Sequence, residues 1–484
     1  MSEPGGVVAG SRAELSSLLG EVGWSVSRLV HEVNREMGAG YVSRTTASEW
    51  VNCSRVPRQP LPTVVAHVLS QAASRVIAAN CLWPGVAGSA EWVSADVGTQ
   101  VSWDLHGMKA LINDWLGSGG TVFDGDRRSF MAISGAALTA PAWEYVKSIG
   151  AAPLRMSSSG LFGASSFSRG KFTPATMEYF TVLIAAFRKM DDLEGGSTEN
   201  LRHIREAILQ ATHYLRVGSF SDAKLPGELL GALAQLSQIA GWMAYDADFH
   251  GLAQRHFRVG LQAAHSVGEQ NLGAHILACM SYQAVYLGKL EDAKELADAA
   301  AKASFKAHPA VRSLVSSRVA YVKACDGNES GFRSAINESK KYLGGSDGKG
   351  DFPSYLYWYS PAELDVQCGQ SLLTLSLASN KKSSKLVSEA EKLLLSKVAS
   401  AETDRPRDSL FHSAWLARAH VKRGELHRGL AVAEGAVRRA PAVASARSRK
   451  VLGDLDKDLT HLRGDRHLPE VRELRSQLRL ALAT

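Results

Sequence analysis

The first part of the chain alternates apolar and polar positions with the period of an α-helix. Three segments show this pattern between residues 14 and 73, so each has one apolar face to bury against the others. The apolar positions are Leu15, Leu18, Leu19, Val26, Leu29, Val30, Val33, Val64, Val65, Val68 and Leu69. The second segment ends at Gly38-Ala39-Gly40, since glycine adopts the backbone angles that terminate helices. A small helical bundle is predicted for residues 1–78.

A third helix of different character is predicted between the second and fourth. Short polar side chains lie at its start, Trp50 is the expected core anchor, and prolines from Pro57 onward end it. A helix that follows a glycine-bearing turn and opens with polar side chains is typical of a recognition helix in the major groove of DNA. The residues expected at base edges are Arg44, Thr45, Thr46, Ser48 and Glu49, preceded by Ser43, and those expected at phosphates are Asn52, Arg55 and Arg58.

The segment from Glu14 to Ala73 resembles the N-terminal helix-turn-helix of actinobacterial XRE-type transcriptional regulators that carry a C-terminal tetratricopeptide-like (TPR-like) region. The matching motifs are Gly23-Trp24-Ser25, Leu29-Val30-His31-Glu32-Val33-Asn34, Ala47-Ser48-Glu49-Trp50 and Pro57-Arg58. The family usually has glycine shortly after the tryptophan, where this chain has Cys53 and Ser54. The resemblance implies a repressor of differentiation and antibiotic-production genes. The alternative is a TPR-type protein-interaction scaffold whose helix-turn-helix no longer binds DNA.

Residues 79–172 have a different composition. Glycine-rich and serine-rich stretches such as residues 117–121 and 157–160 alternate with short apolar pieces. The former are typical of turns and linkers, and the latter of short helices. This region is therefore interpreted as a linker with connecting helices.

From residue 173 to 484 the helical period is almost uninterrupted, and segments resemble one another. Ala253, Phe257 and Gly260 are followed forty positions later by Ala293, Ala297 and Ala300. A third copy places Gly429, Ala433 and Ala436 after a glycine turn. Small residues at fixed positions let antiparallel helices approach closely, as in TPR proteins. The predicted fold class is therefore all-α, with the N-terminal helix-turn-helix bundle followed by a right-handed TPR-like solenoid.

Two aromatic groups in this region are candidate ligand-binding residues. Tyr355, Tyr357, Trp358 and Tyr359 lie within five positions, and they either pack one repeat on the next or line a groove. The second group is expected on the concave side of neighbouring repeats, where a small molecule or peptide effector would bind, although repeat core is the alternative. Its members are Trp242, Tyr245, Asp246, Tyr282 and Tyr286.

Charge and hydropathy restrict the partners. The chain carries a formal net charge of +7, and residues 418–484 alone have a surplus of seven basic residues, which suits a solvated helix face or DNA phosphates. Residues 1–80 carry a surplus of only one. No apolar run reaches the roughly 18 residues that a membrane span needs, and the N-terminus lacks the apolar core of a secretion signal. We expect a cytoplasmic, nucleoid-associated protein with no membrane partner.

No catalytic or metal-binding pattern is recognisable. The five cysteines are far apart, without a Cys-x-x-Cys pair, and the histidines between residues 203 and 275 form no ligand motif. We therefore expect no metal, no cofactor and no enzymatic activity. A single recognition helix buries little surface, so the expected partners are double-stranded DNA and a second copy of the chain.

Overall fold

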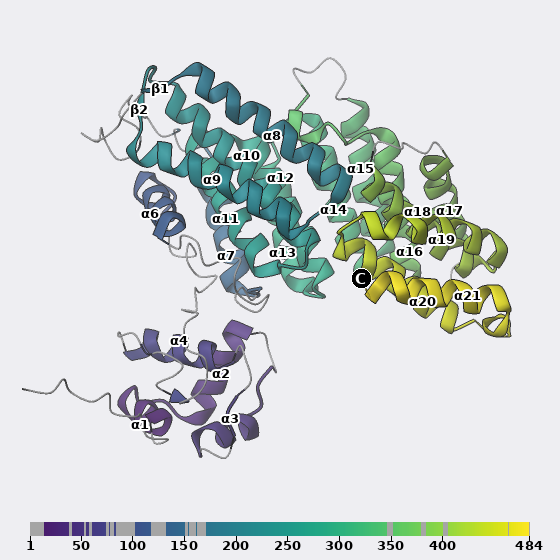
Figure 1. Cartoon of the computed structure of the whole chain (residues 1–484), viewed down its shortest axis with the longest axis horizontal. Coiled ribbons are helices and arrows are strands. Elements are labelled where there is room, and N and C mark those ends of the chain that lie inside the picture. Colours follow the sequence, from purple (N-terminus) through teal and green to yellow (C-terminus); the bar gives the residue numbers. More distant parts are fainter. Residues whose placement is uncertain are drawn as a thin grey trace, which may run out of the picture. The chain divides into compact units, whose positions relative to one another are not determined.

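The computed structural model describes residues 14–37, 41–52, 55–57, 61–73, 77, 82–83, 102–117, 132–150, 153, 161, 171–345, 352–378, 384–399, 405–462 and 464–483. The chain divides into two compact units: a head unit of residues 1–100 with 118–140, and a large unit of residues 101–117 with 141–484. Both are built almost entirely from helices, which confirms the all-α prediction (Figure 1). Of the helices in the described residues, none combines the length and apolarity that crossing a bilayer requires.

The head unit contains a four-helix bundle. Its helices are α1 (Glu14–Glu21), α2 (Val26–Met37), α3 (Arg44–Val51) and α4 (Leu61–Ala73). The apolar faces predicted from the sequence meet in one core, in which Leu29, Val33, Trp50, Val64 and Leu69 are almost completely buried. Burying these side chains removes their apolar surface from water, which is the main stabilising contribution in a unit of this size.

The large unit begins with elements that precede its repeated part. These are α6 (Leu105–Gly117), α7 (Ala136–Ser148, from residue 141 onward in this unit), β1 (Lys171–Phe172), α8 (Pro174–Glu194), α9 (Thr198–Val217) and β2 (Ser219–Phe220). β1 and β2 pair in parallel, with Phe172 opposite Phe220. The Thr173 hydroxyl caps the first turn of α8, and Pro174 at the first helical position suits the start of a helix.

The repeated part consists of helices that pack on their neighbours in sequence. They are α10 (Leu225–Asp246), α11 (His250–Val267), α12 (Gln270–Tyr286), α13 (Leu290–Ala303), α14 (Pro309–Cys325), α15 (Glu329–Gly344), η2 (Ser354–Leu356), α16 (Pro361–Ala378), α17 (Ser384–Ala399), α18 (Pro406–Arg423), α19 (Leu426–Arg439), η3 (Ala440–Ala442), α20 (Ala446–Thr460), η4 (Asp465–His467) and α21 (Pro469–Ala483). Helices α10 to α19 form five successive pairs, and the first helix of each pair also contacts the first helix of the next.

Small residues determine how closely the paired helices approach. A Cβ atom at Gly241 of α10 would lie 2.5 Å from the Phe257 ring of α11, and a Cβ atom at Gly429 of α19 would lie 2.9 Å from a Val421 methyl of α18. Ala253 and Ala293 are completely buried. The small residues singled out by their spacing therefore lie at the helix contacts, as predicted.

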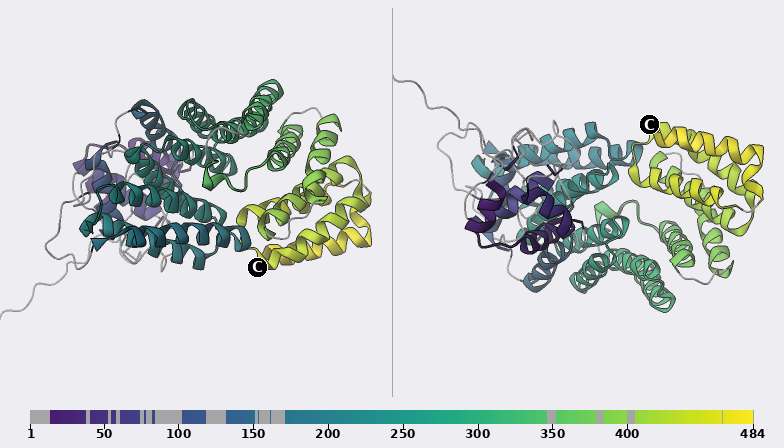
Figure 2. Two further views of the ribbon diagram at one scale, coloured as in Figure 1. Left: turned by 90° about the horizontal axis from the view of Figure 1, so that it is seen from above. Right: turned by 90° about the horizontal axis from the view of Figure 1, so that it is seen from below.

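The end of the repeated part packs back on α8, which precedes it. Helix α18 packs against α8 as well as against its sequence neighbours, and the Ala444 amide donates to the Glu194 carbonyl at 2.8 Å. The first helices of the pairs therefore form a closed cycle of contacts with α8, and Figure 2 shows the C-terminal helices beside the early ones. We call the side chains at this junction the closure cluster, which consists of Asp191, Asp192, Asp246, Arg407 and Arg447. The sequence period does not predict this closure, because each repeat specifies only its nearest neighbours.

Candidate functional site

The first candidate site is the start of α3 in the head unit. Ser43 is the N-cap of this helix, and its hydroxyl accepts a hydrogen bond from the Thr46 amide at 3.1 Å. The hydroxyls of Ser43 and Thr46 also lie 2.9 Å apart, and the Ser48 hydroxyl donates to the Arg44 carbonyl at 2.9 Å. Three of the hydroxyls predicted to contact DNA are thus engaged within the helix itself.

The remaining predicted DNA-binding residues are distributed unevenly along α3. Arg44 and Thr45 are exposed in its first turn, and Asn52 is exposed at its C-cap. Glu49 lies 3.4 Å from the Arg55 guanidinium. Of the predicted DNA-binding residues of α3, Arg44 and Thr45 are therefore the most available for contacts with DNA. Arg58, and the turn at Cys53 and Ser54, lie outside the described residues.

Buried residues position α3. Ala47 and Trp50 on its inner face are completely buried in the core. The Asn34 side chain of α2 bonds both polar groups of Val42: its amide nitrogen donates to the Val42 carbonyl at 2.9 Å, and its oxygen accepts from the Val42 amide at 2.7 Å. These two bonds fix the segment that enters α3. The role of Asn34 was not anticipated, although its place beside the apolar stripe of α2 was the available signal.

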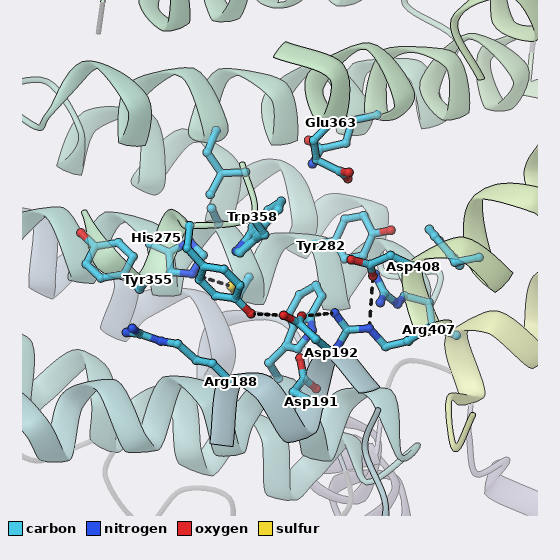
Figure 3. Close-up of a pocket in the computed structure, with 18 of the residues that line it drawn as sticks. Arg188, Asp191, Asp192, His275, Tyr282, Tyr355, Trp358, Glu363, Arg407 and Asp408 are labelled. Carbon is cyan, nitrogen blue, oxygen red and sulfur yellow. Dashed lines mark hydrogen bonds and ion pairs between the residues drawn. The ribbon is translucent and has the colours of Figure 1, made fainter. Parts of the chain in front are cut away.

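The second candidate site is a pocket in the large unit, inside the closed cycle (Figure 3). It contains about 890 Å³ of space between atoms, its open mouth included. Helices α8, α10, α12, α14, α16, α18 and α20 contribute to its wall, together with residues 355–358. Six aromatic side chains line it, namely Trp242, Tyr282, Tyr355, Tyr357, Trp358 and Phe411. The rest of the lining is mostly polar or charged, and a concave pocket that combines aromatic rings with convergent polar groups is a candidate small-molecule site.

The five predicted ligand-binding residues cluster around this pocket, but they divide between its wall and the layer behind it. Trp242 and Tyr282 line the wall with their rings stacked 6.0 Å apart. Tyr245 and Asp246 are buried behind them, and Tyr286 packs against Tyr245 with ring centres 5.3 Å apart. Trp242 and Tyr282 therefore face the pocket, whereas Tyr245, Asp246 and Tyr286 belong to the packing behind it, and ligand binding by this group stays a prediction.

The aromatic segment at residues 355–359 divides in the same way. Tyr355, Tyr357 and Trp358 line the pocket. Tyr359 is buried in the helix packing instead, with its hydroxyl 3.0 Å from the Ser313 hydroxyl. Spacing could not assign these residues, because the segment combines the short 3₁₀ helix η2 with irregular backbone and has no constant period.

The closure cluster forms one side of the pocket. Arg407 is ion-paired with Asp191, lies 3.4 Å from Asp192 and donates to the neighbouring Asp408 at 3.2 Å. Arg447 approaches Asp246 at 3.3 Å. Burial raises the pKa of Asp191 to about 6, although the charge of Arg407 acts in the opposite direction. A carboxyl with this pKa takes up a proton in mildly acidic solution.

Two further arginines, Arg188 and Arg318, line the pocket without an ion-pair partner among the described residues. Arg188 donates to the Gln235 side chain at 2.7 Å, and Arg318 stacks on Tyr282 with its guanidinium carbon 4.3 Å from the ring centre. Burial, followed by the charges of Arg318 and Arg188, lowers the pKa of His275 to about 3. These residues were missed from the sequence, because they come from three separate helices and share no local motif.

The described residues bring together one group with metal-ligand chemistry, Glu391, His420 and Glu425. Arg423 already contacts both glutamates, at 2.6 Å and 3.3 Å. Its charge opposes a bound cation at the same position. We interpret this group as an ion-paired cluster between α17, α18 and the start of α19.

Comparison of the chain with protein-family models, with curated proteins and with solved structures finds no match in any of the three.

Proposed function

We propose that the chain is a DNA-binding transcription regulator. Its head unit is a helix-turn-helix domain that reads an operator with α3, and its large unit is a TPR-like domain that dimerises and senses a signal. The resemblance to actinobacterial XRE-type regulators supports repression of differentiation and antibiotic-production genes as the regulated process.

The observation that carries this proposal is the two-sided character of α3. Ala47 and Trp50 hold one side in the core, while Arg44 and Thr45 are exposed at the first turn. Residues at the start of a recognition helix contact base edges, and arginine is well suited to guanine while a threonine methyl suits thymine. The bonds between Asn34 and Val42 support a fixed approach of α3, which specific readout requires.

We include a homodimer in this proposal because of the small surface that one head unit can bury on DNA. One small head buries too little surface for a tight specific complex, whereas two heads on half-sites about 34–36 Å apart add their contacts. We propose that the large unit provides the dimer contact, since it contributes most of the chain.

The test is a gel-retardation assay with genomic fragments that co-purify with the protein. Arg44→Ala combined with Thr45→Ala should weaken operator binding by about 1–3 kcal/mol or more, because both exposed side chains are proposed to contact base edges. Arg428→Ala is the matched control for the lost charge, since Arg428 is exposed on α19. Equal operator affinity in wild type and double variant would contradict the proposal.

A second function has one specific observation in its favour. The hydroxyls of Ser43, Thr46 and Ser48 bond within α3, and Glu49 lies against Arg55, which reduces the groups available to DNA. On this alternative, the chain is a TPR-type interaction scaffold with a degenerate helix-turn-helix. It predicts no enrichment of particular genomic fragments and no steep salt dependence of DNA retention.

A further inference from the structure

The lining of the pocket in the large unit carries four arginines and four carboxylates, and two of the arginines have no carboxylate partner among the described residues. Arg318 of α14 makes no hydrogen bond or ion pair within the described part of the chain, and its guanidinium stacks on Tyr282. Among the described residues, Arg188 of α8 donates only to neutral groups: the Gln235 side chain at 2.7 Å, and the carbonyl and hydroxyl of Ser354 at 3.3 Å and 3.5 Å. Partly buried guanidinium groups without an anion are unfavourable unless a ligand neutralises them.

The carboxylates of the same pocket have other means of compensation. Asp191, Asp192 and Asp408 share Arg407, and Glu363 lies 3.6 Å from the His412 ring. Burial also raises the pKa of Asp191, so this carboxyl takes up a proton more readily than an ordinary aspartate. Arginine cannot lose its proton in a protein. Arg188 and Arg318 are therefore the charges of this pocket that lack a counter-ion among the described residues, and a bound anion would supply one.

Aromatic rings form part of the wall between these charges. The rings of His275 and Tyr355 stack at 5.5 Å with an interplanar angle of 18°, and Trp242 stacks on Tyr282. Figure 3 shows Arg188, His275 and Tyr355 on one side of the pocket, and Arg407 and Asp408 on the other. His275 is only 4% exposed, and its Nδ1 atom has no hydrogen-bond partner among the described residues. A neutral imidazole in this position can orient a polar group of a ligand.

We propose that this pocket binds a small planar molecule that carries one carboxylate. The carboxylate lies between Arg188 and Arg318, and the ring lies among Trp242, Tyr282 and Trp358. This inference names the chemical class of the signal and rests on the proposed function for its biological meaning. Since α8, α18 and α20 all contribute to the pocket wall, a bound ligand also stabilises the closed cycle.

The test uses the full chain and three acids: benzoate, 1-naphthoate and indole-3-acetate, each compared with its uncharged primary amide. Isothermal titration calorimetry and the shift in Tm are measured for every pair. At least one acid should bind and raise Tm, and its amide should bind at least about tenfold more weakly, because only the acid pairs with a guanidinium. Equal binding of acid and amide, or no binding of any acid, overturns the inference without requiring a variant.

Two matched variants locate the site. Arg318→Gln should weaken binding of the acid at least about tenfold. Arg312→Gln is the control and should leave binding of the acid unchanged. Arg312 lies on the same helix and also stacks on a tyrosine, with its guanidinium carbon 4.0 Å from the Tyr342 ring centre. It does not line the pocket. Unchanged binding in Arg318→Gln, or equal losses in both variants, contradicts the site.

Retardation of operator DNA is measured on the same preparations. Loss of acid binding without loss of DNA binding refutes only the ligand class. If an acid binds as predicted but the chain has no operator affinity, only the proposed function as a transcription regulator is refuted.

Discussion

Arg407 of α18 is ion-paired with Asp191 of α8, although 216 positions separate them in the chain. Both side chains are buried, and both belong to the junction that closes the cycle of helices. Helices α9 to α17 lie between α8 and α18 in the sequence, and this pair joins the two ends of the cycle directly. Its removal should therefore affect the whole large unit and not only one helix pair.

We predict that Arg407→Leu strongly destabilises the large unit. The substitution leaves the carboxylates of Asp191, Asp192 and Asp408 without the guanidinium they share, and breaking a buried pair in this way costs about 3–5 kcal/mol. The free energy of unfolding is measured with urea on the full chain. Arg333→Ala is the control: its bidentate pair with Glu389 is partly exposed, so the expected loss is about 1 kcal/mol or less. Similar losses in both variants would show that closure contributes little.

The pH dependence of the free energy of unfolding should show the effect of the lowered pKa of His275. Burial and the charges of Arg318 and Arg188 lower its pKa to about 3, so between pH 6.5 and 3 the unfolded chain binds a proton that the folded chain does not. Its contribution to stability is present above pH 6.5 and is lost as the pH falls, at about 1.4 kcal/mol per pH unit. His275→Gln should make the free energy of unfolding depend less steeply on pH between 6 and 5.

Asp191 should act in the opposite direction over the same range. Its folded pKa of about 6 lies above the ordinary value, so its stabilising contribution is complete below about pH 4 and is lost as the pH rises to 6. Asp191→Asn removes this loss, so the variant's stability should rise more steeply with pH than that of the wild type. Urea unfolding at pH 5, 5.5 and 6 measures both variants. Slopes that change in the same direction would contradict one of the two assignments.

Two glycines of α10 should respond oppositely to alanine. At Gly241 a Cβ atom would lie 2.5 Å from the Phe257 ring, so Gly241→Ala should destabilise the large unit by about 1–3 kcal/mol through overpacking. At Gly231 a Cβ atom would meet nothing within 4 Å, so Gly231→Ala should stabilise the helix by about 0.5–1 kcal/mol. Thermal unfolding monitored by circular dichroism compares them. A gain in Tm for Gly241→Ala would show that α10 and α11 separate easily.

The salt dependence of DNA binding should report the role of Arg44. If its guanidinium contacts a phosphate, Arg44→Ala lowers affinity for all sequences and reduces the slope of log K against log salt by about one. If it contacts a base, the slope changes little and discrimination between operator variants falls. Filter binding at several salt concentrations distinguishes these results. A variant with the wild-type slope and the wild-type discrimination would place Arg44 outside the DNA contact.

The sequence was informative where structure depends on local period. Most apolar positions of the head unit and the small residues at Ala253, Gly260 and Ala293 are buried as predicted, whereas Val26 and Val30 are only half-buried. The capping role of Ser43 could also have been recognised, because Ser43 and Thr46 have the spacing of an N-cap and its third helical residue. The Ser43 hydroxyl was instead expected to contact DNA.

The pocket could not be predicted to the same extent. Trp242 and Tyr282 were identified because aromatic residues on neighbouring repeats are visible in the sequence. Arg188 and Arg318 were not, since an arginine on an amphipathic helix normally lies in solvent, and only the closure of the cycle brings these two to one pocket. The pKa of His275 likewise depends on burial and on charges from other helices, which no local pattern contains.

The junction between α8 and α18 has a consequence for how this protein can change. A chain of stacked repeats with free ends can gain or lose a unit while the others keep their contacts. Here an added or deleted helix pair would carry Ala444 away from Glu194 and leave both ends without their partner. The contact between α8 and α18 therefore fixes the number of helix pairs. Insertions are expected to accumulate in the connections between helices instead.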